Sequence, residues 1–215
     1  MIYNNQYAIC DIESGGLPQR LKKRATIEVA LTEIAIVIVS NPGLEIVDKK
    51  SWLIKPYSKE LIYEDEAAKV SGITKQMCEK DGQDIEVVFK ELCDFVKKYK
   101  KGQRLPILTG HNLRRFDLEF IENLFEMMKT DPSKYFDESV EDTMEWMRKK
   151  YVEAASFNLF SCTTMAGIDH VEAHRALPDT VATAKLWVYL LKCLRGSAVE
   201  QKEVKKFRDS FTFEF

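Results

Sequence analysis

The feature that most constrains this chain is an apolar stretch near the N-terminus that ends in two carboxylates. Residues 7–10 are mainly apolar, Asp11 and Glu13 follow on alternate positions, and residues 14–16 (Ser-Gly-Gly) interrupt the pattern. Side chains two apart on a strand share a face, so the sequence predicts that the two acids project together. Two neighbouring anions repel each other, and a hard divalent cation relieves that repulsion. The pair alone fits equally well a strand end whose acids point into water.

Other segments predict further strands. Residues 27–39 are apolar and β-branched, and residues 45–55 alternate well enough to pair back on them through the turn at 41–43. Residues 105–109 form a short apolar run typical of a buried strand. Strands come first and then alternate with helices, which predicts one α/β domain with a mixed sheet.

Helices are predicted from apolar residues at helical spacing and from start and stop signals. They are expected within 64–80 (two short pieces), 84–99, 114–129, 142–150, 157–166 and 178–196. Asp142 is expected as an N-cap of its helix. Pro178 is expected to fix the start of the last helix, because proline is favoured in the first turn.

Composition indicates a soluble globular protein. The 215 residues are 45% hydrophobic and 31% charged, and no apolar run approaches a membrane span. Residues 1–10 lack the pattern of a secretory signal. The five cysteines are an odd number without a C-x-x-C pair, which predicts reduced thiols in a cytoplasm. The net charge of −2 provides no global basic field, so a nucleic-acid partner would rely on local patches.

Further acids and a histidine fall at predicted element ends. Asp117 and Asp179 lie at helix starts, and His174 precedes Asp179 by five residues. Element ends converge on a common cleft in α/β folds, and a loop histidine can accept a proton from water. Singly, these residues are explained as helix-dipole acids and a loop histidine. Together they predict an acidic site with a base beside it.

Three segments resemble the motifs of the DEDDh 3′–5′ exonuclease superfamily, which includes the proofreading subunits of bacterial DNA polymerase III. Residues 11–17 resemble the first motif, residues 110–117 the second, and residues 174–179, followed by Ala182-Thr183, the third. The intermediate marks Glu33-Ile34-Ala35, Gly72-Ile73-Thr74 and Asp142-Thr143 also fit. The likeness extends over about residues 6–195.

The resemblance implies a ribonuclease H-like fold, with a mixed five-stranded sheet flanked by helices. It implies an exonuclease domain over residues 1–196, followed by a charged and aromatic tail over 197–215. The implied ligands of two divalent metal ions, Mg²⁺ or Mn²⁺, are Asp11, Glu13, Asp117 and Asp179. His174 is the implied general base. The implied nucleotide-binding residues are Ser14, Gly15, His111 and Asn112.

The sequence departs from the family pattern at three places. Three residues rather than two separate Asn112 from Phe116, so the local loop is expected to differ while the metal ligands are kept. Residues 14–16 replace the commoner Thr-Thr-Gly, which leaves contacts to the terminal nucleotide less well predicted, although Ser14 keeps a hydroxyl. Pro178 stands directly before the last aspartate of the third motif.

A basic cluster directly follows the first motif. It consists of Arg20, Lys22, Lys23 and Arg24. Two explanations carry equal weight: contacts to substrate phosphates, or a solvated loop with no specific role.

The sequence therefore predicts a metal-dependent 3′–5′ exonuclease acting on single-stranded or frayed DNA 3′ ends and releasing nucleoside 5′-monophosphates. One alternative is an exoribonuclease or oligonucleotide nuclease of the same superfamily, because nothing in the sequence recognises or excludes a 2′-hydroxyl. Another is a non-catalytic, polymerase-associated binding module, against which the complete set of four acids and one histidine argues. A DNA polymerase is a candidate partner, and no membrane partner is expected. Proofreading, repair and stand-alone roles are left open.

Overall fold

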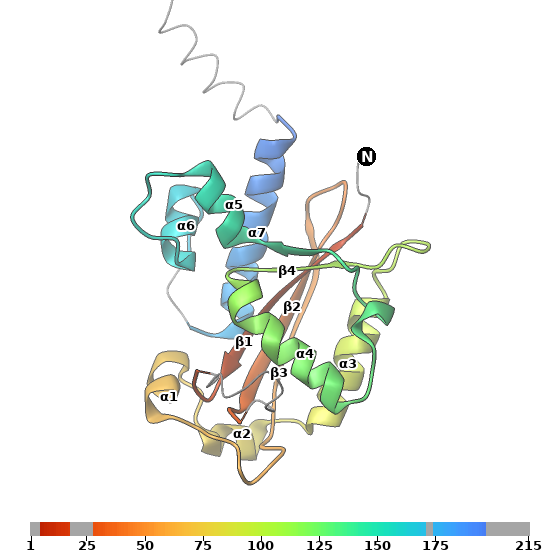
Figure 1. The fold of residues 1–215 in the computed structure, drawn as a ribbon, viewed down its shortest axis with the longest axis vertical. Coiled ribbons are helices and arrows are strands. Elements are labelled where there is room, and N and C mark those ends of the chain that lie inside the picture. Colours follow the sequence, from red (N-terminus) through yellow and green to blue (C-terminus); the bar gives the residue numbers. More distant parts are fainter. Residues whose placement is uncertain (1–4, 18–27, 171–173, 197–215) are drawn as a thin grey trace, which may run out of the picture.

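The sheet at the centre of the protein is mixed and five-stranded (Figure 1). The structure, a computed structural model, describes residues 5–17, 28–170 and 174–196. The strands are β1 (Tyr7–Ser14), β2 (Leu31–Val39), β3 (Ile46–Leu53), β4 (Ile107–Gly110) and β5 (Val140–Asp142), in the order β3-β2-β1-β4-β5. β2 is antiparallel to β1 and β3, whereas β4 is parallel to β1 and β5. The predicted fold class is confirmed.

Helices cover both faces of this sheet (Figure 1). In the described residues they are α1 (Asp65–Ser71), α2 (Lys75–Asp81), α3 (Ile85–Lys97), α4 (Asp117–Met127), α5 (Thr143–Lys150), α6 (Leu159–Met165) and α7 (Ala176–Leu194). α3 and α4 pack on one face, and α5, α6 and α7 pack on the other. Two short 3₁₀ turns occupy Leu113–Arg115 and Pro132–Lys134.

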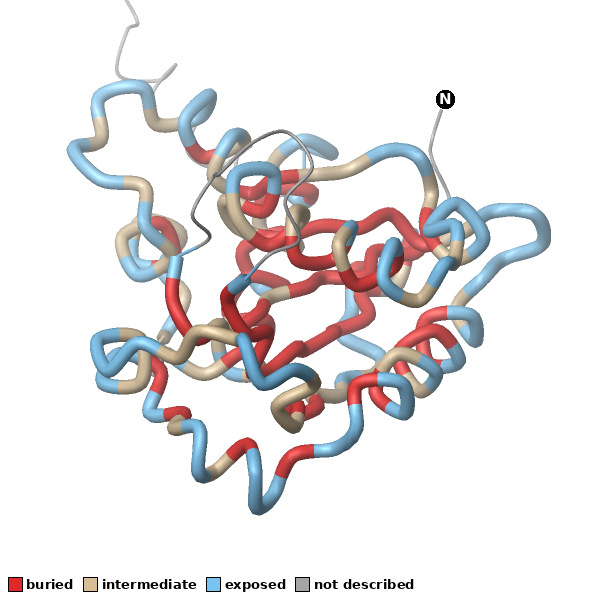
Figure 2. The backbone as a smooth tube through the Cα atoms, turned by 60° about the horizontal axis from the view of Figure 1, so that its bottom comes forward, coloured by how far each residue is buried: buried red, intermediate tan, exposed pale blue. Residues whose placement is uncertain are grey.

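The central strand β1 divides its side chains between these two layers. Cys10 and Ile12 belong to the apolar cluster with α3 and α4, whereas Ile9 belongs to the cluster with α7. Because side chains alternate along a strand, Asp11 and Glu13 continue the face that meets α7. β1, β2 and β4 form the buried centre of the molecule (Figure 2). The fold thus directs both acids toward the layer that contains the last helix.

Two predicted helices differ from the observed ones at their starts. The last helix begins at Ala176, two residues before the predicted start, so Pro178 lies within its first turn. Proline is tolerated there because first-turn N–H groups have no partner within the helix. The helix predicted from 114 is divided at Phe116, whose backbone (φ −137°, ψ −75°) separates a 3₁₀ turn from α4.

The fifth strand has no signal of its own in the sequence. Residues 140–142 are only three, two of them acidic, and their pairing with β4 defines the strand. The predicted strand 27–39 is also shorter than expected, beginning at Leu31. A short edge strand such as β5 is specified by its neighbour rather than by local pattern.

Asp142 ends β5 and caps α5, as predicted. Its carboxylate accepts hydrogen bonds from the backbone N–H groups of Met144 (2.9 Å), Asn112 (3.0 Å) and Arg114 (3.3 Å). The last two bonds fix the loop that leads from β4 into α4, the helix that begins with Asp117. A buried helix cap therefore also holds the second motif in place.

Some predictions fall outside the described residues. The basic cluster at 20–24 and the tail 197–215 are among them, so their proposed roles and the domain boundary at 196 stay predictions. No helix in the described ranges is long and apolar enough to cross a membrane. The five cysteines are free thiols.

Asp142→Ala is expected to lower the free energy of unfolding by about 2–3 kcal/mol, because three partly buried backbone N–H groups lose their acceptor. Urea denaturation measures this change. Asp131→Ala is the matched control, since Asp131 caps an exposed 3₁₀ turn through a single bond to Ser133 N–H. Equal losses in the two variants would contradict the role assigned to Asp142.

Candidate active site

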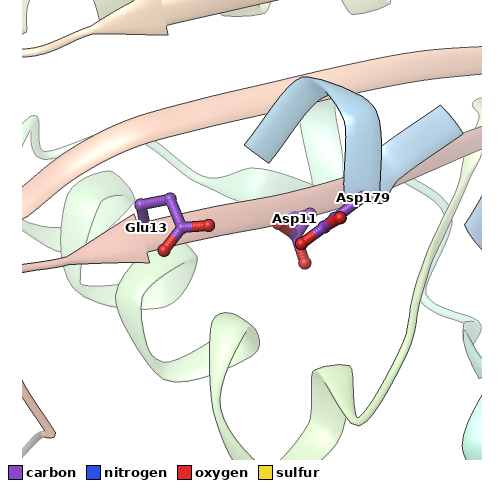
Figure 3. Close-up of side chains that lie close together, drawn as sticks. All are labelled: Asp11, Glu13 and Asp179. Atoms are coloured by element: carbon purple, nitrogen blue, oxygen red, sulfur yellow. The ribbon is translucent and has the colours of Figure 1, made fainter. Parts of the chain in front are cut away.

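Three carboxylates from distant parts of the sequence converge at the end of β1 (Figure 3). Asp11 and Glu13 come from the strand, and Asp179 comes from the first turn of α7. One oxygen of each side chain lies within 4.8 Å of an oxygen of the others. The structure therefore brings together three of the four predicted metal ligands.

The fourth predicted ligand, Asp117, reaches the same segment from the other layer. It is 4% exposed at the start of α4, and its Oδ1 accepts a hydrogen bond from the backbone N–H of Ile12 at 3.1 Å. Ile12 lies between the two acids of β1. The bond thus connects α4 directly to the backbone that carries Asp11 and Glu13.

Burial and mutual repulsion hold protons on this cluster. Burial first, and then the neighbouring acids led by Asp117, raise the pKa of Asp11 well above its usual range. Burial and the charge of Asp179 raise the pKa of Glu13 to about 8. Burial raises the pKa of Asp117 to about 7, although the hydrogen bond from Ile12 opposes this change. These carboxylates are poised to release protons when a cation enters.

The donor set fits a hard divalent cation. Asp11, Glu13 and Asp179 offer only carboxylate oxygens, which Mg²⁺ and Mn²⁺ prefer. A cation among them would offset the repulsion that helps to raise the pKa values of Asp11 and Glu13. The site thus meets the chemical requirement for such a metal.

His174, the predicted base, is exposed and lies just before α7. Its backbone adopts a left-handed conformation (φ 39°), which is uncommon for a residue other than glycine. Such conformations persist where the surrounding structure holds them, and they cluster at functional sites. The backbone of the third motif is therefore constrained at this histidine.

A second histidine, which the motif analysis did not single out, contacts the cluster. His170 Nε2 lies 2.9 Å from Asp179 Oδ1, and the His170 side chain is only 8% exposed. A histidine nine residues before an aspartate carries no recognisable spacing, so only the structure reveals this contact.

An ion pair between buried Glu33 and partly exposed Arg175 lies beside the carboxylates and was also missed as a site feature. Glu33 on β2 pairs with Glu13 in the sheet register and is 3% exposed. Arg175 donates two hydrogen bonds to it. A charge within the otherwise apolar strand 31–39 was the available signal, because buried charges require partners.

The first two predicted nucleotide-binding residues make contacts within the turn after β1. The Ser14 hydroxyl donates to the Gly16 carbonyl at 2.6 Å. A Cβ at Gly15 would lie 2.5 Å from the Ile62 carbonyl oxygen, so glycine is required by close backbone packing. Contact of Ser14 and Gly15 with a nucleotide stays a prediction.

The other two predicted nucleotide-binding residues, His111 and Asn112, stabilise the loop after β4. The His111 ring nitrogens lie 2.8 Å from Thr143 Oγ1 and 2.9 Å from the Phe157 carbonyl, and burial lowers the pKa of the imidazole. Asn112 uses its backbone N–H to bond Asp142. These contacts are internal, and a nucleotide-binding role for His111 and Asn112 likewise stays a prediction.

The metal-free protein is expected to lose stability as the pH rises from about 5.5 to about 8.5. Unfolded carboxyls are ionised there, whereas Glu13 and Asp117 retain protons in the folded state. The folded state thus binds more protons, so the free energy of unfolding should fall by an amount of the order of 5 kcal/mol. Urea denaturation in the presence of a chelator measures this trend.

Glu13→Gln should make the free energy of unfolding less dependent on pH, because the substituted amide does not titrate. Glu86→Gln, an exposed change on α3, should leave this dependence as in the wild type. A stability that increases over the same pH range would contradict the raised pKa values.

Comparison with known proteins places this site in a family. The RNase_T family model, described as exonuclease, matches residues 8–187. The chain is 27% identical over 201 residues to a PolC-type DNA polymerase III of Staphylococcus aureus. That alignment covers 93% of this chain and 12% of the polymerase, so the chain spans about one-eighth of that relative.

Solved structures share the fold. The zinc-bound complex of E. coli exonuclease I with single-stranded DNA superposes with a TM-score of 0.72 at 20% identity, covering 90% of this chain and 42% of that one. The nuclease domain of 3′hExo, a DEDDh family member bound to rAMP, superposes with a TM-score of 0.69 at 17% identity. The superposition covers 88% of this chain and 93% of that one. The family match confirms the resemblance and the enzyme class predicted from the motifs: this chain belongs to the exonuclease family.

Proposed function

We propose that this protein is a metal-dependent 3′–5′ exonuclease that removes nucleoside 5′-monophosphates from single-stranded or frayed DNA 3′ ends. The observation that carries the proposal is the convergence of Asp11, Glu13 and Asp179. Acids from two distant segments lie within 4.8 Å of one another despite their repulsion. Holding repelling carboxylates together costs folding free energy, which is retained only where the site has a function for them. This favours catalysis over a non-catalytic binding module.

Asp11, Glu13 and Asp179 would hold two divalent cations, Mg²⁺ or Mn²⁺, with Asp117 as the fourth ligand. When bound, such cations lower the pKa of the attacking water, neutralise the phosphate and stabilise the leaving 3′-oxygen. Asp117 also positions the strand, because it accepts a hydrogen bond from Ile12 N–H and so fixes the backbone between the two β1 acids. The protein thus supplies ligands that are positioned before substrate arrives.

His174 would accept the proton of the attacking water on a ring nitrogen. The water oxygen would form the new bond to phosphorus while the bond from phosphorus to the 3′-oxygen breaks. A nucleoside 5′-monophosphate would leave, and the 3′-oxygen of the shortened strand would take up a proton from solvent to become a hydroxyl. The exposed position of His174 directly before α7 supports this role, since the base must meet water and substrate. Its constrained backbone supports a fixed approach to the cluster.

DNA is the proposed substrate, with RNA as the second candidate. The relative with 27% identity over 93% of this chain is a DNA polymerase, and the exonuclease I structure holds single-stranded DNA. Both support DNA, and the first makes a polymerase a candidate partner. The 3′hExo domain, bound to rAMP, is the observation that favours RNA.

Asp11→Asn is expected to lower the cleavage rate about a thousandfold, corresponding to roughly 4 kcal/mol of lost transition-state stabilisation. Stepwise shortening of 5′-labelled single strands with Mg²⁺ or Mn²⁺ measures the rate. Asp94→Asn, the same change at an exposed position of α3, is the matched control.

The same assay compares DNA and RNA strands of equal sequence. Faster cleavage of DNA is expected, and faster cleavage of RNA would select the second candidate. Undiminished cleavage by Asp11→Asn, or in excess chelator, would contradict the metal-dependent mechanism.

His174→Ala is expected to lower turnover by about 10²–10⁴-fold, the usual contribution of a general base, while Mn²⁺ affinity stays unchanged. Calorimetric titration of Mn²⁺ separates the two effects. His170→Ala is the matched comparison, because His170 contacts Asp179 but is not the proposed base. A larger loss of turnover in His170→Ala than in His174→Ala would contradict the assignment of His174 as the base.

A further inference from the structure

The segment that carries Asp179 is joined to the sheet by one buried carboxylate. Glu33 of β2 accepts hydrogen bonds from Arg175 Nε (3.0 Å), Arg175 Nη2 (2.9 Å) and the backbone N–H of Ala176 (3.1 Å). Ala176 is the first residue of α7. Both oxygens of Glu33 are therefore engaged by the start of the helix.

This contact restricts orientation as well as distance. A guanidinium binds a carboxylate through two parallel N–H donors, and its planar fork fixes the relative angle of the groups. The third bond, from Ala176, anchors the helix backbone itself. Together they define where the first turn of α7 begins, and Asp179 lies in that turn.

Stability alone does not account for this pair. Glu33 is buried and its partner Arg175 is partly exposed, and a carboxylate buried in this way is often no more stabilising than an apolar side chain of similar size, because its charge must be desolvated. Every residue of β2 is buried, and those on either side of Thr32-Glu33 are apolar, so apolar packing is available at this depth. The pair instead lies beside the acidic site, where the positions of the carboxylates determine cation binding. Glu33 is beside Glu13, and Arg175 follows His174 directly.

We infer that Arg175 is a positioning residue that, through Glu33, sets the start of α7 so that Asp179 meets Asp11 and Glu13 at a cation-binding distance. This inference rests on the proposed function. It also explains why Glu33, a fifth acid beside the cluster, is not available as a ligand: its oxygens are committed to Arg175 and Ala176.

The test measures Mn²⁺ affinity by calorimetry on the full chain for Arg175→Lys and Arg175→Met. Lysine keeps the positive charge but lacks the fork, so both variants should bind Mn²⁺ about tenfold more weakly, a typical loss when a residue orienting a metal ligand is changed. Hydrogen exchange of residues 176–180, followed without metal, should become faster in both variants. Arg175→Lys should remain closer to the wild type in its free energy of unfolding, because Glu33 keeps a paired charge.

Lys50→Met is the control, since it removes the cation of a half-exposed ion pair with Glu91 on β3 and α3. It should leave both Mn²⁺ affinity and exchange of residues 176–180 unchanged. Wild-type Mn²⁺ affinity in Arg175→Lys, or weaker affinity without faster exchange in the first turn of α7, would overturn the inference. If the wild-type protein itself fails to bind Mn²⁺, the proposed function fails and the inference falls with it.

Discussion

Repulsion among the carboxylates at the end of β1 is the constraint on which the rest of the site depends. Asp11, Glu13 and Asp179 lie within 4.8 Å of one another, and burial with mutual repulsion raises the pKa values of the two β1 acids. Left to itself, such a group would separate or remain protonated. Its persistence requires a rigid scaffold on each side, and the proposed cation would offset the remaining repulsion.

The scaffold uses backbone hydrogen bonds rather than side-chain contacts alone. Asp117 accepts from Ile12 N–H, Glu33 accepts from Ala176 N–H, and Asp142 accepts from two N–H groups of the loop before α4. Each bond fixes a segment that carries a predicted site residue. Because such bonds determine backbone position directly, small shifts in the first turn of α7 or α4 are resisted.

The sequence predicted the fold class, the order of most elements and the acids that converge. β1 was recognisable because a strand alternation ends in two acids, and Asp142 was recognisable as a cap because polar residues before helices have a local role. Residues 140–142 were not predicted as a strand, since their pairing with β4 is a long-range property. The contacts of Arg175 and His170 also escaped prediction, because they join residues whose spacing follows no helical or strand period.

Asp11, Glu13 and Asp179 are proposed to form a metal site. Anomalous diffraction from crystals grown with Mn²⁺ and a nucleoside 5′-monophosphate tests it most directly, because the signal locates the ions themselves. Two anomalous peaks are expected, coordinated by these carboxylates and by Asp117. Well-ordered crystals with no peak at these side chains, or with Mn²⁺ bound only elsewhere, would contradict it.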